Sequence, residues 1–225
     1  MKVLELFSGT GSVGKCCKQL GWDVVSVDLL LPADHQVDIM DFDYKQYEHF
    51  DIIWASPPCT FYSNLQNCWI GRTRKDGITV TKEWIEEQRK YSDKLIKKTF
   101  EIIDYFQPHW WFVENPQTGQ LKDRDIVKNI PYYDVSYCMY SNWGYEKKTR
   151  IWTNKKDWNN LICDKSGSCG NMINNTKELI KRHRTTADGG YDKRKVKIEG
   201  QIHGGTNKLE RYRIPENLIF SLFIE

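Results

Sequence analysis

The first 28 residues constrain the fold of this chain more than any other segment. Residues 2–7 form a compact apolar run that predicts a strand, and the glycine-rich stretch Ser8–Gly14 follows it directly. Residues 12–20 then predict a helix, which Gly21 ends, and residues 23–28 predict a second strand. A strand, a glycine turn, a helix and another strand make a βαβ unit, and such units build parallel sheets.

The glycine turn and the end of the second strand indicate a nucleotide-type ligand. Glycines between a strand and a helix let backbone N–H groups approach a ligand closely. The second strand ends in Asp28, whose carboxylate is able to accept hydrogen bonds from ribose hydroxyls. A glycine pattern alone is weak, and the two features together make a stronger signal.

The rest of the first half continues the alternation. Strands are predicted at residues 51–55 and 110–114, and apolar residues at helical spacing predict a long helix over residues 82–106, closed by Pro108. We therefore expect an α/β fold of the Rossmann-like type, with a mostly parallel sheet and helices on both faces. Ligands of such sheets bind beyond the carboxyl ends of the strands. The residues that fall at or just past predicted strand ends are Gly14, Asp28, Cys59 and Glu114.

The second half divides into three parts by composition. Strands are expected at residues 134–140 and 148–153, joined by a turn at residues 142–144. Asn, Lys, Gly and Thr then dominate to about residue 207, and Pro215 stands where a final helix would begin. We expect a catalytic and cofactor-binding domain at 1–154, a small loop-rich insertion at 155–207, and a C-terminal helix within 208–225 that returns to the domain.

The segment Ser56-Pro57-Pro58-Cys59 carries the clearest chemical signal. The two prolines end the strand before them, since neither has an N–H for a ladder and both fix φ. The thiol of Cys59 thus stands on a stiff loop at a strand end, where a nucleophile is needed. The competing interpretation is an ordinary loop with a small buried cysteine.

A carboxyl group and a guanidinium complete the predicted reaction centre. Glu114 ends the strand at 110–114 among apolar neighbours and is a candidate proton donor. Arg150 follows in a basic run and is expected either to orient that carboxylate or to bind a phosphate or a base oxygen. The polar loop at residues 61–81 carries Arg72, Arg74 and Lys75, which suits a mobile flap over a charged substrate or, equally, a disordered spacer.

These motifs, in this order and spacing, resemble those of the DNA cytosine-5 methyltransferases. The resemblance runs from end to end except for residues 155–207. The segments that carry it are Phe7–Gly14, Asp38-Ile39, Pro57-Pro58-Cys59 with Ser63, Glu114-Asn115-Pro116, Lys148-Thr149-Arg150 and Arg211–Pro215. Two positions depart from the family pattern, since Lys148 replaces an arginine and Glu146 replaces a glutamine in the basic motif.

The resemblance implies a methyl donor, a substrate and a set of site residues. It implies that S-adenosyl-L-methionine is held by Phe7, Ser8, Gly9, Thr10, Gly11, Ser12, Val13, Asp28, Leu29, Asp38, Ile39, Ser56 and Pro58. It implies that DNA is bound by Pro57, Ser63, Arg72, Arg74, Asn115 and Lys148, and that Cys59, Glu114 and Arg150 are catalytic. A cytosine would be flipped into the site, attacked at C6 by Cys59, protonated at N3 by Glu114 and methylated at C5.

The short insertion implies reduced target recognition. The family places its recognition region where this chain has only residues 155–207, so we expect a short or lax target sequence or a partner protein that supplies recognition. The acceptor is open among DNA, RNA and free nucleotide. Two other interpretations stay open: an enzyme that methylates an exocyclic nitrogen, for which Ser56-Pro57-Pro58 suffices without Cys59, and a catalytically silent nucleic-acid-binding protein on the same fold.

Seven cysteines and no secretory signal favour reduced thiols and an intracellular location, either cytoplasm, nucleoid or nucleus. No apolar run is long enough to span a bilayer. Cys163 and Cys169 with His183, and Cys138 as a fourth, offer zinc ligands. Their spacing is longer than that of a usual zinc knuckle, so unpaired thiols without a metal are the favoured prediction.

Overall fold

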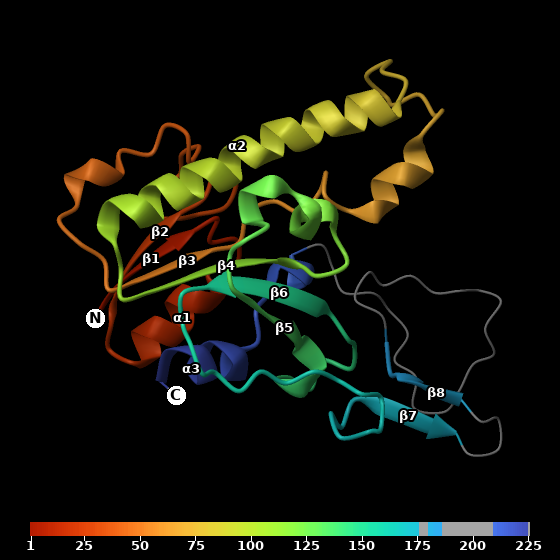
Figure 1. Cartoon of the computed structure of the whole chain (residues 1–225). Helices are drawn as coiled ribbons and strands as arrows, with labels where there is room; N and C mark the ends of the chain where they lie inside the picture. The colour runs from red at the N-terminus through yellow and green to blue at the C-terminus, as the bar shows by residue number, and fades with distance from the viewer. Residues whose placement is uncertain (176–179, 186–208, 225) are drawn as a thin grey trace.

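The computed structural model describes residues 1–175, 180–185 and 209–224 (Figure 1). Its centre is a six-stranded sheet in the order β2-β1-β3-β4-β6-β5. The strands are β1 (Lys2–Leu6), β2 (Asp23–Val27), β3 (Ile52–Ala55), β4 (Trp110–Pro116), β5 (Tyr132–Ser136) and β6 (Lys148–Thr153). Neighbouring strands among β2, β1, β3 and β4 are parallel, whereas β6 runs antiparallel to both β4 and β5.

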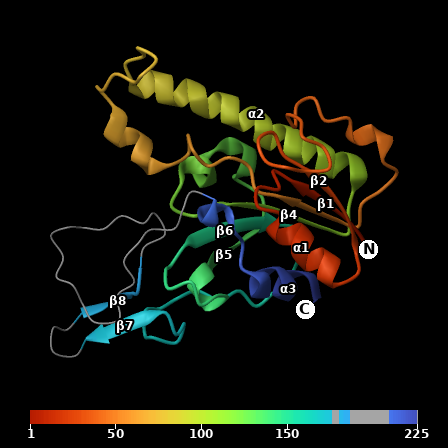
Figure 2. The same cartoon turned by 180° about the vertical axis from the view of Figure 1, so that it is seen from behind.

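Helices cover both faces of the sheet, as the sequence predicts. The long helix α2 (Lys82–Phe106) lies on one face, and α1 (Ser12–Gln19) and α3 (Glu216–Ile224) lie side by side on the other (Figures 1 and 2). The Thr81 hydroxyl caps the start of α2 by accepting from the N–H of Trp84. Gln107 ends α2 in the left-handed conformation, and Pro108 prevents its continuation.

Alternation along the strands builds two apolar layers. Toward α1 and α3 the sheet buries Val3, Ile52, Trp54, Phe112 and Ile151. Toward α2 it buries Leu4, Leu6, Ile53, Val113 and Trp152. Because successive residues point to opposite faces, each central strand is apolar on both sides, which is the pattern of a strand covered by helices on both faces.

The polar loop at residues 61–81 is folded rather than a structureless spacer. It contains the 3₁₀ helix η2 (Asn64–Trp69) and then a small hairpin. There the Gly71 N–H donates to the carbonyl of Val80, the Val80 N–H donates to the carbonyl of Arg72, and Thr73 bridges Thr79. Turn glycines at positive φ, Gly71 and Gly77, allow the chain to reverse there. Local hydrogen bonding by polar residues explains this order, which hydrophobic periodicity alone does not reveal.

The second half differs from prediction in its strand boundaries. β5 begins at Tyr132, and residues 137–139, expected to extend the strand, form the 3₁₀ helix η5 (Tyr137–Met139). In the region expected to be loop-rich, β7 (Met172–Asn175) pairs antiparallel with β8 (Ile180–His183). Residues 176–179 and 186–207 of the predicted insertion lie outside the described residues.

The smaller elements connect this framework. They are η1 (Tyr44–Gln46), η3 (Gln120–Asp123), η4 (Asp125–Val127) and η6 (Glu210–Tyr212). None of the helices in the described ranges combines the length and apolar character that a membrane span requires.

Candidate active site

The register of the parallel strands brings three predicted motifs to one edge of the sheet. Leu6 of β1 pairs with Ala55 of β3, and Ala55 pairs with Val113 of β4. The residues just beyond these positions are therefore level with one another. The glycine turn, the Pro-Pro-Cys loop and Glu114 thus meet at the carboxyl edge, which is where ligands of such sheets bind.

The glycine turn is held in an unusual backbone conformation by Asp28. Phe7, Gly9 and Gly11 all have positive φ, and at Phe7 this conformation is strained. One carboxylate oxygen of Asp28 accepts the Gly9 N–H at 2.9 Å, and the other accepts the N–H groups of Leu30 and Leu31 at 2.8 Å each. Asp28 therefore fixes the turn, and lone pairs remain on the oxygen that faces Gly9.

A second carboxylate, which the sequence analysis did not single out, binds the start of α1. Buried Glu5 accepts the N–H groups of Val13 and Gly14 at 3.1 and 2.9 Å. A Cβ at position 14 would lie 2.8 Å from a Glu5 carboxylate oxygen, so only glycine permits this approach. Burial raises the pKa of Glu5 to about 7, against the lowering effect of the two backbone donors. The anion-binding end of α1 is thus occupied by the chain's own carboxyl group.

The C-terminal segment returns to the glycine turn, as the family resemblance implies. The backbone N–H of Ile214 donates to the Ser12 hydroxyl at 3.2 Å, and that hydroxyl lies 3.2 Å from the Thr10 hydroxyl. A Cβ built on Gly9 would lie 3.7 Å from Cβ of Tyr212. Residues some 200 positions apart in sequence therefore form one wall of the site.

The short acidic motif lies on the same side of the sheet as α2. Asp38 is half-buried and accepts the N–H of Met40 at 2.9 Å. The Ile39 side chain is buried among Leu4, Leu6 and Val27, so only its backbone remains to meet a ligand. Leu29, in contrast, is an exposed apolar side chain beside the glycine turn.

The Pro-Pro-Cys loop is fixed at several points. The Ser56 N–H donates to the carbonyl of Leu6, and the Ser56 hydroxyl accepts from the Trp54 indole at 2.8 Å. The side-chain amide of buried Asn115 donates to the carbonyl of Pro57 at 2.9 Å, which ties this loop to β4. Pro57 is buried and Pro58 is exposed, so the loop has a packed side and an open side.

The thiol of Cys59 is half-buried and lies in the field of two opposite charges. Burial raises the pKa of Cys59, the ammonium group of Lys147 lowers it, and the charge of Glu114 raises it. The Cys59 carbonyl accepts the N–H groups of Tyr62 and Ser63, so the residue begins a tight turn. A thiol on which an ammonium and a carboxylate both act is suited to nucleophilic attack coupled to proton transfer.

Glu114 is buried and has two polar partners that sequence reasoning missed. The Tyr137 hydroxyl donates to one of its oxygens at 3.0 Å, and the Lys147 ammonium lies 3.5 Å from the same oxygen. Burial raises the pKa of Tyr137 well above its usual range, so the phenol keeps its proton and remains a donor. Lys147 lies in the basic run of the sequence. The family motif matches its neighbours Lys148 and Arg150, so the motif does not single out Lys147.

The predicted role of Arg150 as the group that orients Glu114 is wrong. Arg150 pairs across the ladder with Asn115, whereas Glu114 pairs with Ile151. Paired residues share a face, so the Arg150 side chain lies on the opposite face from Glu114. It forms a two-pronged ion pair with Asp134, at 2.7 and 2.8 Å, and lies over the Tyr132 ring. A contact between Arg150 and a base or phosphate stays a prediction.

The predicted substrate residues are spread around this edge. The Ser63 hydroxyl accepts the Leu65 N–H at the start of η2. Arg72 and Arg74 are exposed on the hairpin, over the rings of Trp69 and Trp84 respectively, and Arg74 also pairs with Asp76. Lys148 is exposed at the start of β6.

Comparison with known proteins gives one full-length relative. The chain is 39% identical over 226 residues to a protein of frog virus 3 (isolate Goorha) named "Probable DNA (cytosine-5)-methyltransferase", covering 99% of this chain and 98% of the relative. No protein-family model matches the chain.

Two solved structures are similar to parts of the fold. One, from an Escherichia coli prophage, is described as a "putative DNA modification methyltransferase" and matches 68% of this chain with 16% identity and a TM-score of 0.45. The other is a mutant of Spodoptera frugiperda DNMT2, which matches 72% with 18% identity and a TM-score of 0.42. The chain spans about half the length of each, 46% and 54%. At these TM-scores neither likeness adds to what the viral relative shows. On the strength of that full-length relative, this chain belongs to the DNA (cytosine-5)-methyltransferase family.

Proposed function

We propose that the chain transfers a methyl group from S-adenosyl-L-methionine to C5 of cytosine in DNA. The single observation that carries the proposal is the meeting of Cys59 and Glu114. Cys59 follows β3, Glu114 lies on the adjacent parallel strand β4, and the charge of Glu114 acts on the Cys59 thiol. A nucleophile beside a proton-donating group is what addition to a pyrimidine ring requires.

The residues around the glycine turn fit the proposed methyl donor. The half-buried carboxylates of Asp28 and Asp38 suit a ligand that carries a positive sulfonium and ribose hydroxyls, whereas Glu5 is engaged by the start of α1. Bound there, the donor would supply an electrophilic methyl group. The residues proposed to hold it are Phe7, Ser8, Gly9, Thr10, Gly11, Ser12, Val13, Asp28, Leu29, Asp38, Ile39, Ser56 and Pro58.

The chain's own groups account for the activation of the cytosine. The Cys59 thiol passes its proton to the Glu114 carboxylate, and the thiolate sulfur forms a bond to C6 of the flipped base. Glu114 donates a proton to N3, which neutralises the charge that the addition creates. Once C5 carries the methyl group, a base removes the C5 proton, the S–C6 bond breaks to release the Cys59 thiolate, N3 returns its proton to Glu114, and the ring regains its C5–C6 double bond.

Lys147 is proposed to act on both the Cys59 thiol and the Glu114 carboxyl group. Its ammonium group lowers the pKa of Cys59 and lies 3.5 Å from Glu114. It also donates to the carbonyl of Arg211 at 3.3 Å and lies over the Tyr137 ring. The positive charge thus favours the thiolate before attack, and its contacts to Glu114, Tyr137 and Arg211 hold it in place.

The DNA is proposed to lie along the carboxyl edge of the sheet. Figure 1 shows η2 and its hairpin at one side of that edge and the β7–β8 pair at the other. The hairpin would bring Arg72 and Arg74 toward phosphates, whose attraction to Lys and Arg is independent of sequence. Ser63, Lys148, Asn115 and Pro57 complete the proposed substrate set. With so small a recognition region, we propose a short target or a partner protein that supplies recognition.

Covalent trapping tests the proposal. DNA containing 5-fluorocytosine is incubated with the protein and the methyl donor, and the fluorine at C5 blocks the final elimination. We expect a covalent protein–DNA product for the wild type and for Cys68→Ser, whose thiol is exposed on η2, and none for Cys59→Ser. Matched RNA and free nucleotide in parallel identify the acceptor.

The same variants exclude the other interpretations. Methylation of an exocyclic nitrogen predicts that Cys59→Ser retains methyl transfer. A silent nucleic-acid-binding protein predicts DNA binding without transfer or trapping for every variant. Either result would overturn the proposed reaction.

A further inference from the structure

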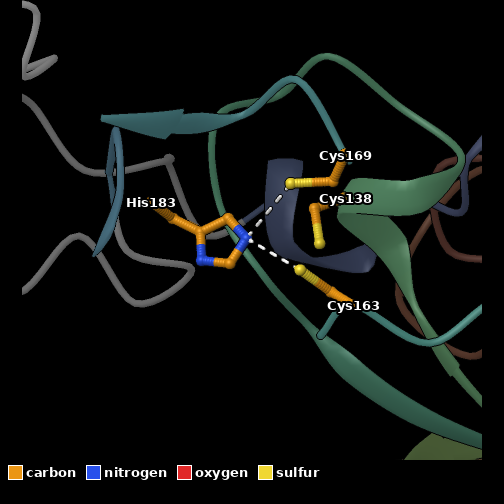
Figure 3. A group of neighbouring side chains, drawn as sticks. All are labelled: Cys138, Cys163, Cys169 and His183. Atoms are coloured by element: carbon orange, nitrogen blue, oxygen red, sulfur yellow. Dashed lines mark hydrogen bonds between the residues drawn. The ribbon is translucent and has the colours of Figure 1, made fainter. Parts of the chain in front are cut away.

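Three thiols and an imidazole from four separate segments converge in one cluster (Figure 3). Cys138 lies on η5, Cys163 follows β6, Cys169 precedes β7, and His183 ends β8. The ligand atoms of all four lie within 4.8 Å of one another. The sulfur atoms of Cys163 and Cys169 lie 3.6 and 3.7 Å from Nε2 of His183.

These distances match a tetrahedral zinc site. Zinc bonds to sulfur at about 2.3 Å and to imidazole nitrogen at about 2.0 Å, so sulfur and nitrogen ligands of one tetrahedron stand about 3.5 Å apart. Three thiolates and one imidazole are also a usual ligand set of closed, structural zinc sites. Cys138 and Cys163 are buried, and Cys169 and His183 are half-buried, so the cluster is largely shielded from solvent.

We propose that Cys138, Cys163, Cys169 and His183 bind one structural zinc ion. The sequence favoured unpaired thiols because the six-residue step from Cys163 to Cys169 is longer than a zinc knuckle. The fold reverses that preference, because it brings in Cys138 from a distant segment and completes a set of four.

The surroundings support a structural role. The buried side-chain amide of Asn171 donates to the carbonyls of Cys138, Ser141 and Cys169 at 2.7–2.9 Å, and its oxygen accepts the N–H of Gly144. Asn171 therefore fixes the backbone that carries two of the four ligands. Ordered outer contacts of this kind orient the ligands of metal sites.

The β7–β8 pair needs stabilisation beyond its own hydrogen bonds, and a bound metal ion would provide it. A two-stranded sheet on its own is marginally stable in water, and a metal ion that binds only the folded state adds its binding free energy to folding. The ion would join this pair, through His183 and Cys169, to η5 of the catalytic domain. Because Cys138 follows Tyr137, the same ion would also steady the phenol that contacts Glu114.

Metal analysis of the full-length chain is the direct test. We expect about one zinc per chain in wild type purified under reducing conditions without chelator, and the same in Cys68→Ser. Cys163→Ser and His183→Ala should lose most of the zinc, whereas His183→Cys, which restores a fourth ligand, should retain it. The proposal is overturned if the wild type contains no zinc. It is also overturned if mass spectrometry without added reductant finds a disulfide between two cysteines of the cluster.

Cobalt substitution keeps the test valid if the ligand variants do not fold. Zinc-depleted wild type titrated with Co²⁺ should develop thiolate-to-cobalt charge transfer and the intense visible bands of tetrahedral cobalt, saturating at one equivalent. His183→Cys should shift those bands, since sulfur replaces nitrogen. Weak octahedral bands, or no saturation at one equivalent, would contradict a site made of these four residues. None of these readouts depends on methyl transfer, so they stand apart from the proposed function.

Discussion

The proposed reaction centre uses a small number of side chains whose charges act on one another. Cys59, Glu114, Tyr137 and Lys147 come from four different segments, and each contact among them involves a buried or half-buried group. Interactions between charges are stronger in such surroundings than in water. The loss of one partner should therefore show as a specific change in one step rather than a general loss of folding.

Glu114→Gln should separate chemistry from cofactor binding. The amide keeps the shape of the side chain but has no proton to give to N3, so methyl transfer should fall at least about 100-fold. Binding of S-adenosylmethionine, measured by calorimetry, should remain near the wild-type value. Equal losses of transfer and of cofactor binding would instead assign Glu114 to the fold.

Lys147→Met should raise the pKa of the Cys59 thiol further. Burial already raises that pKa, and the ammonium group is the main opposing influence, so its removal should shift the alkylation of Cys59 by iodoacetamide to higher pH. The alkylation rate of Cys59, followed by peptide mass spectrometry from pH 7 to 10, measures this shift. Lys147→Arg retains the charge and should stay near the wild-type profile. An unchanged profile for Lys147→Met would show that the charge does not reach the thiol.

At the scale of the element, the start of α1 is tied to the sheet by a buried acid. Glu5 of β1 accepts two N–H groups of the first turn of α1, so the helix is docked by polar contacts as well as by its apolar face. The cost is a carboxyl group taken out of water, which holds the pKa near 7.

Glu5→Gln should flatten the pH dependence of stability. The pKa of Glu5 is raised from 4.5 to about 7 on folding, so its contribution is fully present below pH 4.5 and is lost as pH rises through 7. The loss amounts to about 3 kcal/mol in the wild type, since each pKa unit corresponds to about 1.4 kcal/mol. Urea unfolding between pH 4.5 and 8 should show that decline in wild type and in the exposed control Glu48→Gln. The idea fails if Glu5→Gln shows the same decline.

Elements with strong periodicity were predicted from sequence, whereas elements that depend on distant partners were not. The α2 helix shows its apolar stripe and its terminating Pro108 directly in the sequence, and its bounds are confirmed. The β7–β8 pair has weak periodicity, because its side chains rely on contacts with other segments. In the site, Cys59 follows one recognisable strand and Glu114 lies on another, but Tyr137 and Lys147 contact Glu114 only through tertiary folding. Arg150 failed as the orienting group because strand register, which the sequence does not reveal, decides its face.

At the scale of the whole molecule, the C-terminal helix joins the two ends of the chain. Leu218, Ile219 and Leu222 of α3 are fully buried in the layer that also contains Val13 and Cys17 of α1. This packing holds the preceding segment against the glycine turn, where Ile214 reaches Ser12. We therefore propose that stability and binding of the methyl donor are linked through this helix.

Leu222→Ala should weaken both properties. Removing this buried side chain should lower the free energy of unfolding by about 2–5 kcal/mol, because a cavity remains in the α1–α3 layer. Calorimetric titration with S-adenosylmethionine below the unfolding temperature should show weaker binding, since the segment at residues 209–214 loses its anchor. Ile224→Ala removes similar atoms at an exposed position and should leave both near wild type. If Leu222→Ala weakens stability but leaves cofactor binding unchanged, the packing of α3 does not influence the glycine turn.

The hydrogen bond from Ile214 to Ser12 has a consequence for biosynthesis. The strands and helices of the first 116 residues lie early in the chain and leave the ribosome long before residues 209–224. The wall beside the glycine turn is built by those late residues. A nascent chain should thus assemble its parallel strands first and acquire affinity for the methyl donor only when translation has delivered the last helix.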